Sequence, residues 1–231
     1  MKVHHFILIL FAIVISSCSN NVNSPEFIKK VSGRYLYNSD EVIEVYFKEN
    51  ELYLKWRGAT SIKPLKIDEN TFFVKEMNEK IQFLNNPLDK KNYIVLVQKE
   101  ENEAFVYNFI KLEVNENVPR EYLKNNEFDK ALKGYLSIQK KDSLNAAINE
   151  NDFNSLGYKE LRDKNYKKSI SVFEINVALH PNSANVYDSL AEAFMKSGDT
   201  AKAIVNYKKS LRLDSGNARA KKLIEKLEKN N

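Results

Sequence analysis

The fold is decided by two stretches of this sequence, FNSLGYKELRDKNYKKSISVFEINVALHP (residues 153–181) and YDSLAEAFMKSGDTAKAIVNYKKSLRLDS (residues 187–215), which share one pattern after a 34-residue shift. An aromatic residue opens each stretch, a leucine and a small residue follow, and a second aromatic residue stands 20 positions after the first. Such self-similarity indicates a repeat architecture. The aligned pairs are Phe153 with Tyr187, Leu156 with Leu190, Gly157 with Ala191, Ser169 with Ala203, Ile170 with Ile204, Phe173 with Tyr207, Leu179 with Leu213 and Pro181 with Ser215.

The spacing within each copy predicts two helices that pack closely against each other. Small residues such as Gly157 and Ser169 allow the paired helices to approach. Larger residues such as Leu156 and Phe173 then fill the space between them. Pro181 cannot continue a helix, so it ends the second helix of the first copy. Each copy is therefore expected to be a helical hairpin.

Flanking segments are expected to complete this array, because a single repeat cannot bury its apolar face. Residues 119–141 look like a degenerate first unit, and residues 218–229 look like a capping helix with lysines on its outer side. We therefore expect residues 119–231 to form one all-α domain. The apolar residues that share one face are Ala131, Tyr135 and Ile138 in the first segment and Leu223, Ile224 and Leu227 in the second.

The pattern resembles the tetratricopeptide repeat, which runs aromatic, Leu-Gly, a small residue in the second helix, aromatic and a closing proline. The resemblance covers residues 150–217, and the second copy carries the turn Lys196-Ser197-Gly198-Asp199. It implies a solenoid whose first helices line a concave groove that binds a peptide or another protein. The lysine and asparagine arrangement of the carboxylate-clamp variety is lacking, so a chain terminus is not the expected ligand.

Carried over position by position, the resemblance assigns seven residues to this partner-binding groove. All of them fall on the first helices of the two copies, where a solenoid offers extended surface. The alternative is that they are ordinary solvated residues of a structural stack. The seven residues are Asn154, Tyr158, Arg162, Asn185, Asp188, Glu192 and Lys196.

Residues 31–113 alternate with a period of two, which is typical of strands with one buried face. The alternation breaks at Glu49-Asn50 and then restarts, which predicts a hairpin. Seven or eight short runs at roughly 10-residue spacing predict an antiparallel barrel or half-barrel. Bulky inward residues favour an interior filled with side chains, and a lipid or small-ligand pocket is the alternative. The bulky inward residues are Phe47, Trp56, Phe72 and Phe83.

Residues 1–17 have the pattern of a signal peptide. Ten apolar residues, Phe6 to Ile15, span about 15 Å as a helix, which is half a bilayer core and too short to cross it. The segment Ile15-Ser16-Ser17-Cys18 resembles the lipobox of bacterial lipoproteins, with Ile15 where leucine is usual. That resemblance implies diacylglycerol on the thiol of Cys18 and cleavage just before it. The alternative is an ordinary secretory signal that ends near an unrelated cysteine.

A lipobox places the mature chain in the bacterial cell envelope. Two or three acyl chains contribute about 0.8 kcal/mol per buried CH₂, which is enough for durable membrane attachment. Residues 18–30 would then form a polar tether. Because Ser19 is not acidic, we expect the protein to lie at the outer membrane and face the periplasm.

Cysteine and histidine counts argue against a reactive centre. Cys18 is the single cysteine, so no internal disulfide and no cysteine metal site can form. Only His180 follows the signal peptide, which leaves too few histidines for a metal site or a Ser-His-Asp triad. The net charge of +5 is dispersed, with no basic motif interleaved with aromatic residues. We therefore expect no cofactor, no metal and no nucleic-acid partner.

Residues 153–158 and 182–190 are also similar to the carboxy-terminal accessory region of bacterial β-lactamase-like serine hydrolases. In those proteins a small β-domain and tetratricopeptide repeats follow the hydrolase domain. Over residues 31–113 the resemblance rests on the order of elements alone. It implies an accessory module, because the hydrolase domain itself has no room in this chain.

Three short motifs match those of such hydrolases, but each has an explanation in the repeats. The first serine is expected in the middle of a helix rather than at a helix start facing a cleft. The third motif is expected in the turn between two helices rather than on a strand. We therefore predict no catalytic residue. The motifs are Ser137-Ile138-Gln139-Lys140, Ser183-Ala184-Asn185 and Lys196-Ser197-Gly198.

Together these patterns predict an α+β chain, in which an N-terminal antiparallel β-barrel-like domain precedes an all-α tetratricopeptide-repeat solenoid. The expected function is that of a membrane-anchored, non-catalytic lipoprotein that mediates protein-protein interaction. The alternatives are a small-ligand or lipid carrier that uses the β-domain, and an accessory subunit of a serine hydrolase in trans. The expected segments are 1–17, 18–30, 31–113 and 119–231.

Overall fold

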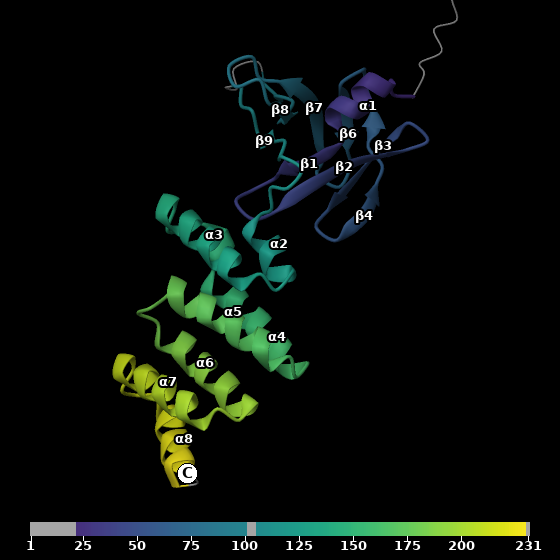
Figure 1. Ribbon diagram of the computed structural model, residues 1–231. Coiled ribbons are helices and arrows are strands. Elements are labelled where there is room, and N and C mark those ends of the chain that lie inside the picture. The colour runs from purple at the N-terminus through teal and green to yellow at the C-terminus, as the bar shows by residue number, and fades with distance from the viewer. Residues whose placement is uncertain (1–21, 101–104, 230–231) are drawn as a thin grey trace, which may run out of the picture.

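The computed structural model describes residues 22–100 and 105–229. The expected signal peptide and Cys18 lie outside these described residues. Figure 1 shows a β-rich part, followed in the chain by helices that extend away from it toward the carboxyl end. The order of antiparallel strands and then helices agrees with the α+β organisation predicted from the sequence.

The β-rich part contains two antiparallel sheets that share one apolar core. The first sheet has the strand order β1-β2-β3-β4 and the second has the order β5-β6-β7-β8-β9, so sequential strands are neighbours within each sheet. The strands of the first sheet are β1 (Gly33–Leu36), β2 (Val42–Lys48), β3 (Glu51–Trp56) and β4 (Ala59–Ile62). Those of the second are β5 (Leu65–Lys66), β6 (Thr71–Val74), β7 (Glu79–Asn85), β8 (Asn92–Leu96) and β9 (Phe109–Ile110).

The predicted hairpin is formed by β2 and β3. Val45 pairs with Leu54 and Phe47 with Leu52, so the apolar residues of the two strands share the face toward the core. The turn residue Asn50 has a φ of 63°, in the left-handed region that asparagine tolerates and that a two-residue hairpin turn requires.

The sheets do not close into the barrel that the sequence predicted. Within the described residues, β1 meets the far end of the second sheet only at an isolated bridge between Tyr35 and Lys111, beside a hydrogen bond from the Leu112 N–H to the Arg34 carbonyl (2.7 Å). Strands β5 and β9 have two residues each, too few to carry a continuous ladder around a barrel. The barrel-like domain is therefore corrected to two packed antiparallel sheets.

A short helix, α1 (Pro25–Val31), replaces the second half of the tether expected over residues 18–30. Ser24 caps it by accepting a hydrogen bond from the Phe27 N–H (3.1 Å), and Pro25 suits its first position. The ring of Phe27 then packs on the aromatic core of the sheets, with ring centroids 5.9 Å from Phe72 and 5.7 Å from Phe83. This segment is part of the β-rich part rather than a free spacer.

The helical part consists of paired antiparallel helices, as the 34-residue pattern predicted. The same shift relates the first residues of α4, α6 and α8, and it also relates α5 to α7, which have equal lengths. The sequence therefore repeats in space as it does along the chain. The helices are α2 (Pro119–Lys124), α3 (Phe128–Lys141), α4 (Glu150–Arg162), α5 (Tyr166–Leu179), α6 (Ala184–Ser197), α7 (Thr200–Leu213) and α8 (Ala218–Lys229).

Helices are present in both segments that were expected to flank the repeats. Helices α2 and α3 form a short first hairpin in which Ala131 and Tyr135 are buried. A 3₁₀ turn, Ala146–Ile148, leads from it into α4. At the other end α8 buries Ala220 and Ile224 against α7, as expected of a capping helix.

The small residues do set the approach of the paired helices. A Cβ atom added at Gly157 would lie 2.5 Å from Cε1 of Phe173, which is completely buried on α5. The hydroxyl of Ser169 donates a hydrogen bond to the Gly157 carbonyl (2.9 Å), which further fixes the crossing of α4 and α5. The backbone of α4 thus touches its partner helix directly.

We expect Gly157→Val to lower the free energy of unfolding by about 1–3 kcal/mol, because the added atoms overpack against Phe173. Chemical denaturation followed by circular dichroism measures this change. The matched control is Ser155→Val, which adds similar bulk at an exposed position of the same helix and should change stability by less than about 0.5 kcal/mol. Equal stability of the two variants would contradict the close packing.

The two parts of the chain are joined through Asp40, in the turn between β1 and β2. Asp40 is 1% exposed, and its carboxylate accepts hydrogen bonds from the Arg120 backbone N–H (2.6 Å), from Nε of Arg120 (2.9 Å) and from the Tyr135 hydroxyl (3.2 Å). Burial raises the pKa of Asp40, and the adjacent Arg120 opposes that rise. An ion pair between Arg34 of β1 and Glu121 of α2 supports the same junction.

We expect Asp40→Ala to destabilise the protein by about 1–3 kcal/mol, because it leaves the buried Tyr135 hydroxyl without its acceptor. Tyr135→Phe removes only that hydroxyl and should cost about 0.5–1.5 kcal/mol. Thermal unfolding measures stability, and limited proteolysis of residues 113–118 measures how firmly the two parts are held together. Wild-type stability and wild-type cleavage in Asp40→Ala would show that the carboxylate does not hold the junction.

Candidate functional site

The first helices of the repeats, α4, α6 and α8, are linked side by side through their polar side chains. Tyr158 of α4 donates a hydrogen bond to Oε2 of Glu192 on α6 (3.3 Å), and Glu192 in turn pairs with Arg219 of α8. The first link joins positions that the 34-residue pattern relates, and the second extends the connection to α8. They identify the face to which the sequence analysis assigned the partner-binding groove.

Three of the seven predicted groove residues meet in one cluster on this face. Tyr158, Asp188 and Glu192 surround the guanidinium of Arg219, which pairs with both carboxylates at once. Nδ2 of Asn217 also donates to Oδ1 of Asp188 (3.1 Å). Two carboxylates therefore share one cation, which leaves an ordered cluster with an excess of negative charge.

A second cluster lies at the amino ends of α4 and α6. Oε1 of Glu150 accepts hydrogen bonds from the Ser183 hydroxyl and from Nδ2 of Asn185, both at 3.0 Å. The predicted residue Asn185 is thus anchored to the preceding repeat. Nearby on α4, the predicted residue Asn154 has a buried Oδ1 with no hydrogen-bond partner among the described residues.

The remaining predicted residues, Arg162 and Lys196, are exposed at the carboxyl ends of α4 and α6. Neither forms an ion pair with any residue that the structure describes. They occupy equivalent positions of the two repeats, so a pair of available cations borders the acidic cluster. The structure therefore brings together some of the seven residues and leaves these two outside the cluster.

Sequence reasoning missed Arg219, Asn217 and Tyr207. Continuing the 34-residue shift would have found the first two, because Arg219 follows Asn185 and Asn217 follows Ser183 at that spacing. The Tyr207 hydroxyl is buried without a hydrogen-bond partner in the described chain, and its ring lies 5.9 Å from the Arg219 guanidinium. Burial raises the pKa of Tyr207, which therefore stays protonated beside the cluster.

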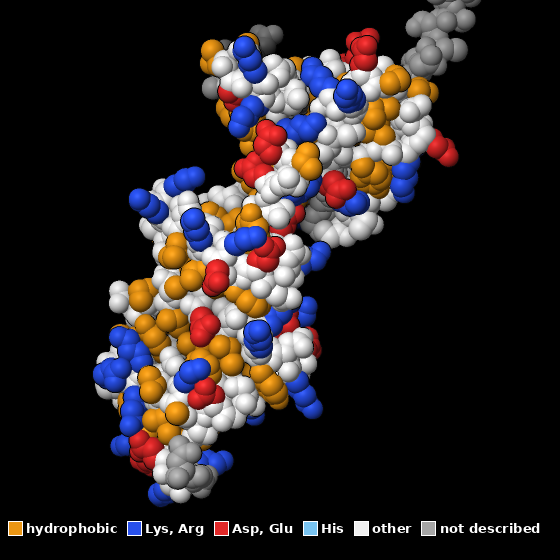
Figure 2. Space-filling view, in the orientation of Figure 1, with side chains coloured by type: hydrophobic (Ala, Val, Ile, Leu, Met, Phe, Trp, Pro, Cys, Tyr) orange, Lys and Arg blue, Asp and Glu red, His pale blue; other side chains and the backbone are white. Residues whose placement is uncertain are grey.

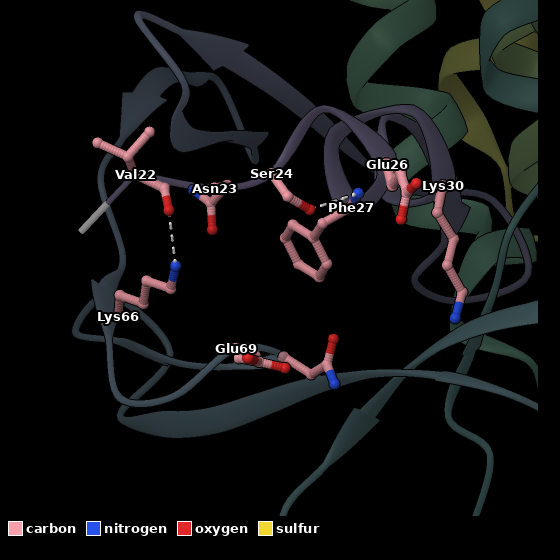
Figure 3. A pocket seen from close by; sticks show the side chains of 9 residues that line it. Val22, Asn23, Ser24, Glu26, Phe27, Lys30, Lys66 and Glu69 are labelled. Carbon is pink, nitrogen blue, oxygen red and sulfur yellow. Dashed lines mark hydrogen bonds between the residues drawn. The ribbon is translucent and has the colours of Figure 1, made fainter. Parts of the chain in front are cut away.

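The interior of the β-rich part is filled with side chains. Tyr35, Phe72 and Phe83 are buried between the sheets, and Phe47 and Trp56 pack against them. A hollow of about 490 Å³ lies instead outside the sheets, between α1 and the turn that precedes β6 (Figure 3). No pattern in the sequence indicated this hollow.

The hydrolase-like motifs lie apart from one another on the helices. Ser137 is exposed in the middle of α3, whereas Lys196 lies at the end of α6. The Ser183 hydroxyl donates to Glu150. Nε2 of His180 lies within hydrogen-bond distance of the Ile148 carbonyl (2.8 Å).

Over residues 22–100 and 105–229, no cluster of three or more histidine, cysteine or acidic side chains could hold a metal ion. In the same ranges, each helix is too short or too polar to cross a membrane. On the face that Figure 2 shows, acidic and basic side chains are interspersed over the helical part, with apolar side chains between them. That face therefore carries no extended surface of one charge.

Helix pairs that recur at a 34-residue spacing, with small residues such as Gly157 and Ala203 buried between the helices, give the helical part a tetratricopeptide-like repeat fold. The solved structures that the chain is similar to include tetratricopeptide repeat domains. The first such domain of Spaghetti (RPAP3), bound to the HSP90 peptide SRMEEVD, is 20% identical over 48% of this chain and 86% of that chain, with a TM-score of 0.35.

Two further solved structures are comparably distant. The MamA crystal structure is 19% identical over 51% of this chain and 66% of that chain, with a TM-score of 0.34. The repeat domain of Arabidopsis OM64 is 15% identical over 49% of this chain and 90% of that chain, with a TM-score of 0.35. No family model and no curated protein matches the chain.

Proposed function

We propose that this protein is a non-catalytic docking protein that binds another protein or a peptide on the face formed by α4, α6 and α8. The observation that carries the proposal is the cluster of Tyr158, Asp188, Glu192 and Arg219, which spans three successive first helices. Three successive helices that each contribute to one polar surface can offer a partner an extended contact area.

The cluster is suited to binding because its side chains are already ordered. Asp188 and Glu192 keep only 14% and 21% of their side-chain surface exposed, and Arg219 restrains both of them. Ordered side chains lose little conformational entropy when a partner binds. The exposed Arg162 and Lys196 at the border add two cations that can receive a partner's carboxylates.

Site-specific photo-crosslinking in cells tests this proposal. A crosslinker at Asn154 should capture a partner, and a crosslinker at Lys133 on α3 should not capture it. With that partner purified, Arg162→Glu combined with Lys196→Glu should weaken its binding by about tenfold, which corresponds to about 1.4 kcal/mol. Both cations are exposed and unpaired with described residues, so the change should leave the fold intact.

The matched control is Lys133→Glu combined with Lys140→Glu, which makes the same charge change on exposed positions of α3. It should bind the partner with wild-type affinity. If both double variants bound equally well, or if Lys133 captured the same protein as Asn154, the proposed face would be wrong.

We further propose that diacylglycerol on Cys18 anchors the protein at the outer membrane, with the repeats in the periplasm. This proposal is supported by the sequence Ile15-Ser16-Ser17-Cys18, which lies at the end of a short apolar run. Since Val22 and Asn23 are hydrogen-bonded to the β-rich part, the tether would run only from Cys18 to Asn21, and at full extension it would span about 13–14 Å. The β-rich part would then lie close to the membrane.

Metabolic labelling with an alkyne fatty acid measures this anchoring. We expect the wild-type protein to carry the label and to sediment with outer membranes, because the acyl chains bury in lipid. Cys18→Ser should lose the label, and Ser19→Ala should keep it. An unlabelled wild-type protein that is released in soluble form would show that the amino terminus is an ordinary secretory signal.

A further inference from the structure

The hollow beside α1 contains a buried hydrogen-bond acceptor that no described residue satisfies. Asn23 is 3% exposed, and its Nδ2 and its backbone N–H both donate to the Asn50 carbonyl, at 2.8 and 3.1 Å. Its Oδ1 is buried and has no partner among the described residues. In Figure 3 this oxygen points into the hollow. A ligand that supplies an N–H or O–H donor would give this oxygen its missing hydrogen-bond partner.

Charged side chains of both signs surround this acceptor. Glu26 and Lys30 come from α1, and Lys66 and Glu69 come from the opposite side of the hollow (Figure 3). Lys66 donates to the Val22 carbonyl (3.2 Å), whereas the other three form no ion pair with a described residue. Two acidic and two basic groups favour a ligand that carries both charges over a simple anion or cation.

The ring of Phe27 gives the hollow an apolar wall. It is half-buried and held by packing on Phe72 and Phe83, so it does not need to be ordered when a ligand binds. The volume of about 490 Å³ lies in the range of small-molecule sites, roughly 300–1,000 Å³. A molecule of the size of a dipeptide fits this combination of volume, charge and apolar surface.

We propose that this hollow binds a short zwitterionic peptide, a site separate from the repeat face. The ammonium group donates to Oδ1 of Asn23 and faces Glu69, which Figure 3 places across the hollow from Asn23. The carboxylate pairs with Lys30 on the opposite side, and an apolar side chain packs on Phe27. The ligand thus satisfies the buried acceptor and two unpaired charges.

Titration calorimetry of the full chain with the dipeptide Ala-Phe tests the site. We expect Ala-Phe to bind at least about tenfold more tightly than N-acetyl-Ala-Phe and than Ala-Phe-amide, because each cap removes one charge. Lys30→Gln should weaken binding by about tenfold. The control, Lys29→Gln, changes the exposed neighbour on the same helix, which does not line the hollow, and should bind as wild type does.

A second pair of variants examines the ammonium end. Glu69→Gln should weaken Ala-Phe binding, and Glu76→Gln, at an exposed position after β6, should not. Equal affinity for the capped and free dipeptides would overturn the zwitterion assignment, as would tighter binding of the neutral sugar maltose. Failure of Ala-Phe to bind at millimolar concentration would overturn the site itself. None of these results depends on a partner at the repeats.

Discussion

The contact between the backbone of α4 at Gly157 and the ring of Phe173 is the constraint on which the helical part depends. No side chain separates the two helices there, so their spacing is set by a single ring. In the next repeat the equivalent positions hold Ala191 and Tyr207, both completely buried. Because the two hairpins repeat along the chain, their first helices follow one another, and polar side chains bridge from each helix to the next.

Sequence periodicity was enough to predict the repeats and the hairpin of β2 and β3, because local spacing dictates which faces are buried. Barrel closure could not be predicted, since it depends on the lengths of the edge strands β5 and β9 rather than on alternation. The polar residues Ser19 to Ser24 indicated a tether, but Phe27, within the expected tether, packs on Phe72 and Phe83 in strands far along the chain.

The candidate sites differ in the same way. Residues at repeat positions could be predicted from the sequence, whereas contacts between distant segments could not. Tyr158, Asp188 and Glu192 could be assigned to one face from repeat positions alone. Arg219 was not assigned to this face because α8 was interpreted as a capping helix. Helix α8 also continues the row of first helices. The unsatisfied oxygen of Asn23 could not be predicted from the sequence, because its burial follows from hydrogen bonds to Asn50 on a distant hairpin.

The attachment of the repeats to the sheets through Asp40 has a mechanical consequence. Besides the covalent backbone, the hydrogen bonds between this carboxylate, Arg120 and Tyr135 and the Arg34–Glu121 pair beside them resist a pull on the carboxyl end. Such bonds break over much shorter displacements than interlocked apolar cores do. Under tension the contacts at the junction would therefore break first. The repeats would then rotate as a rigid unit relative to the sheets while both cores stayed folded.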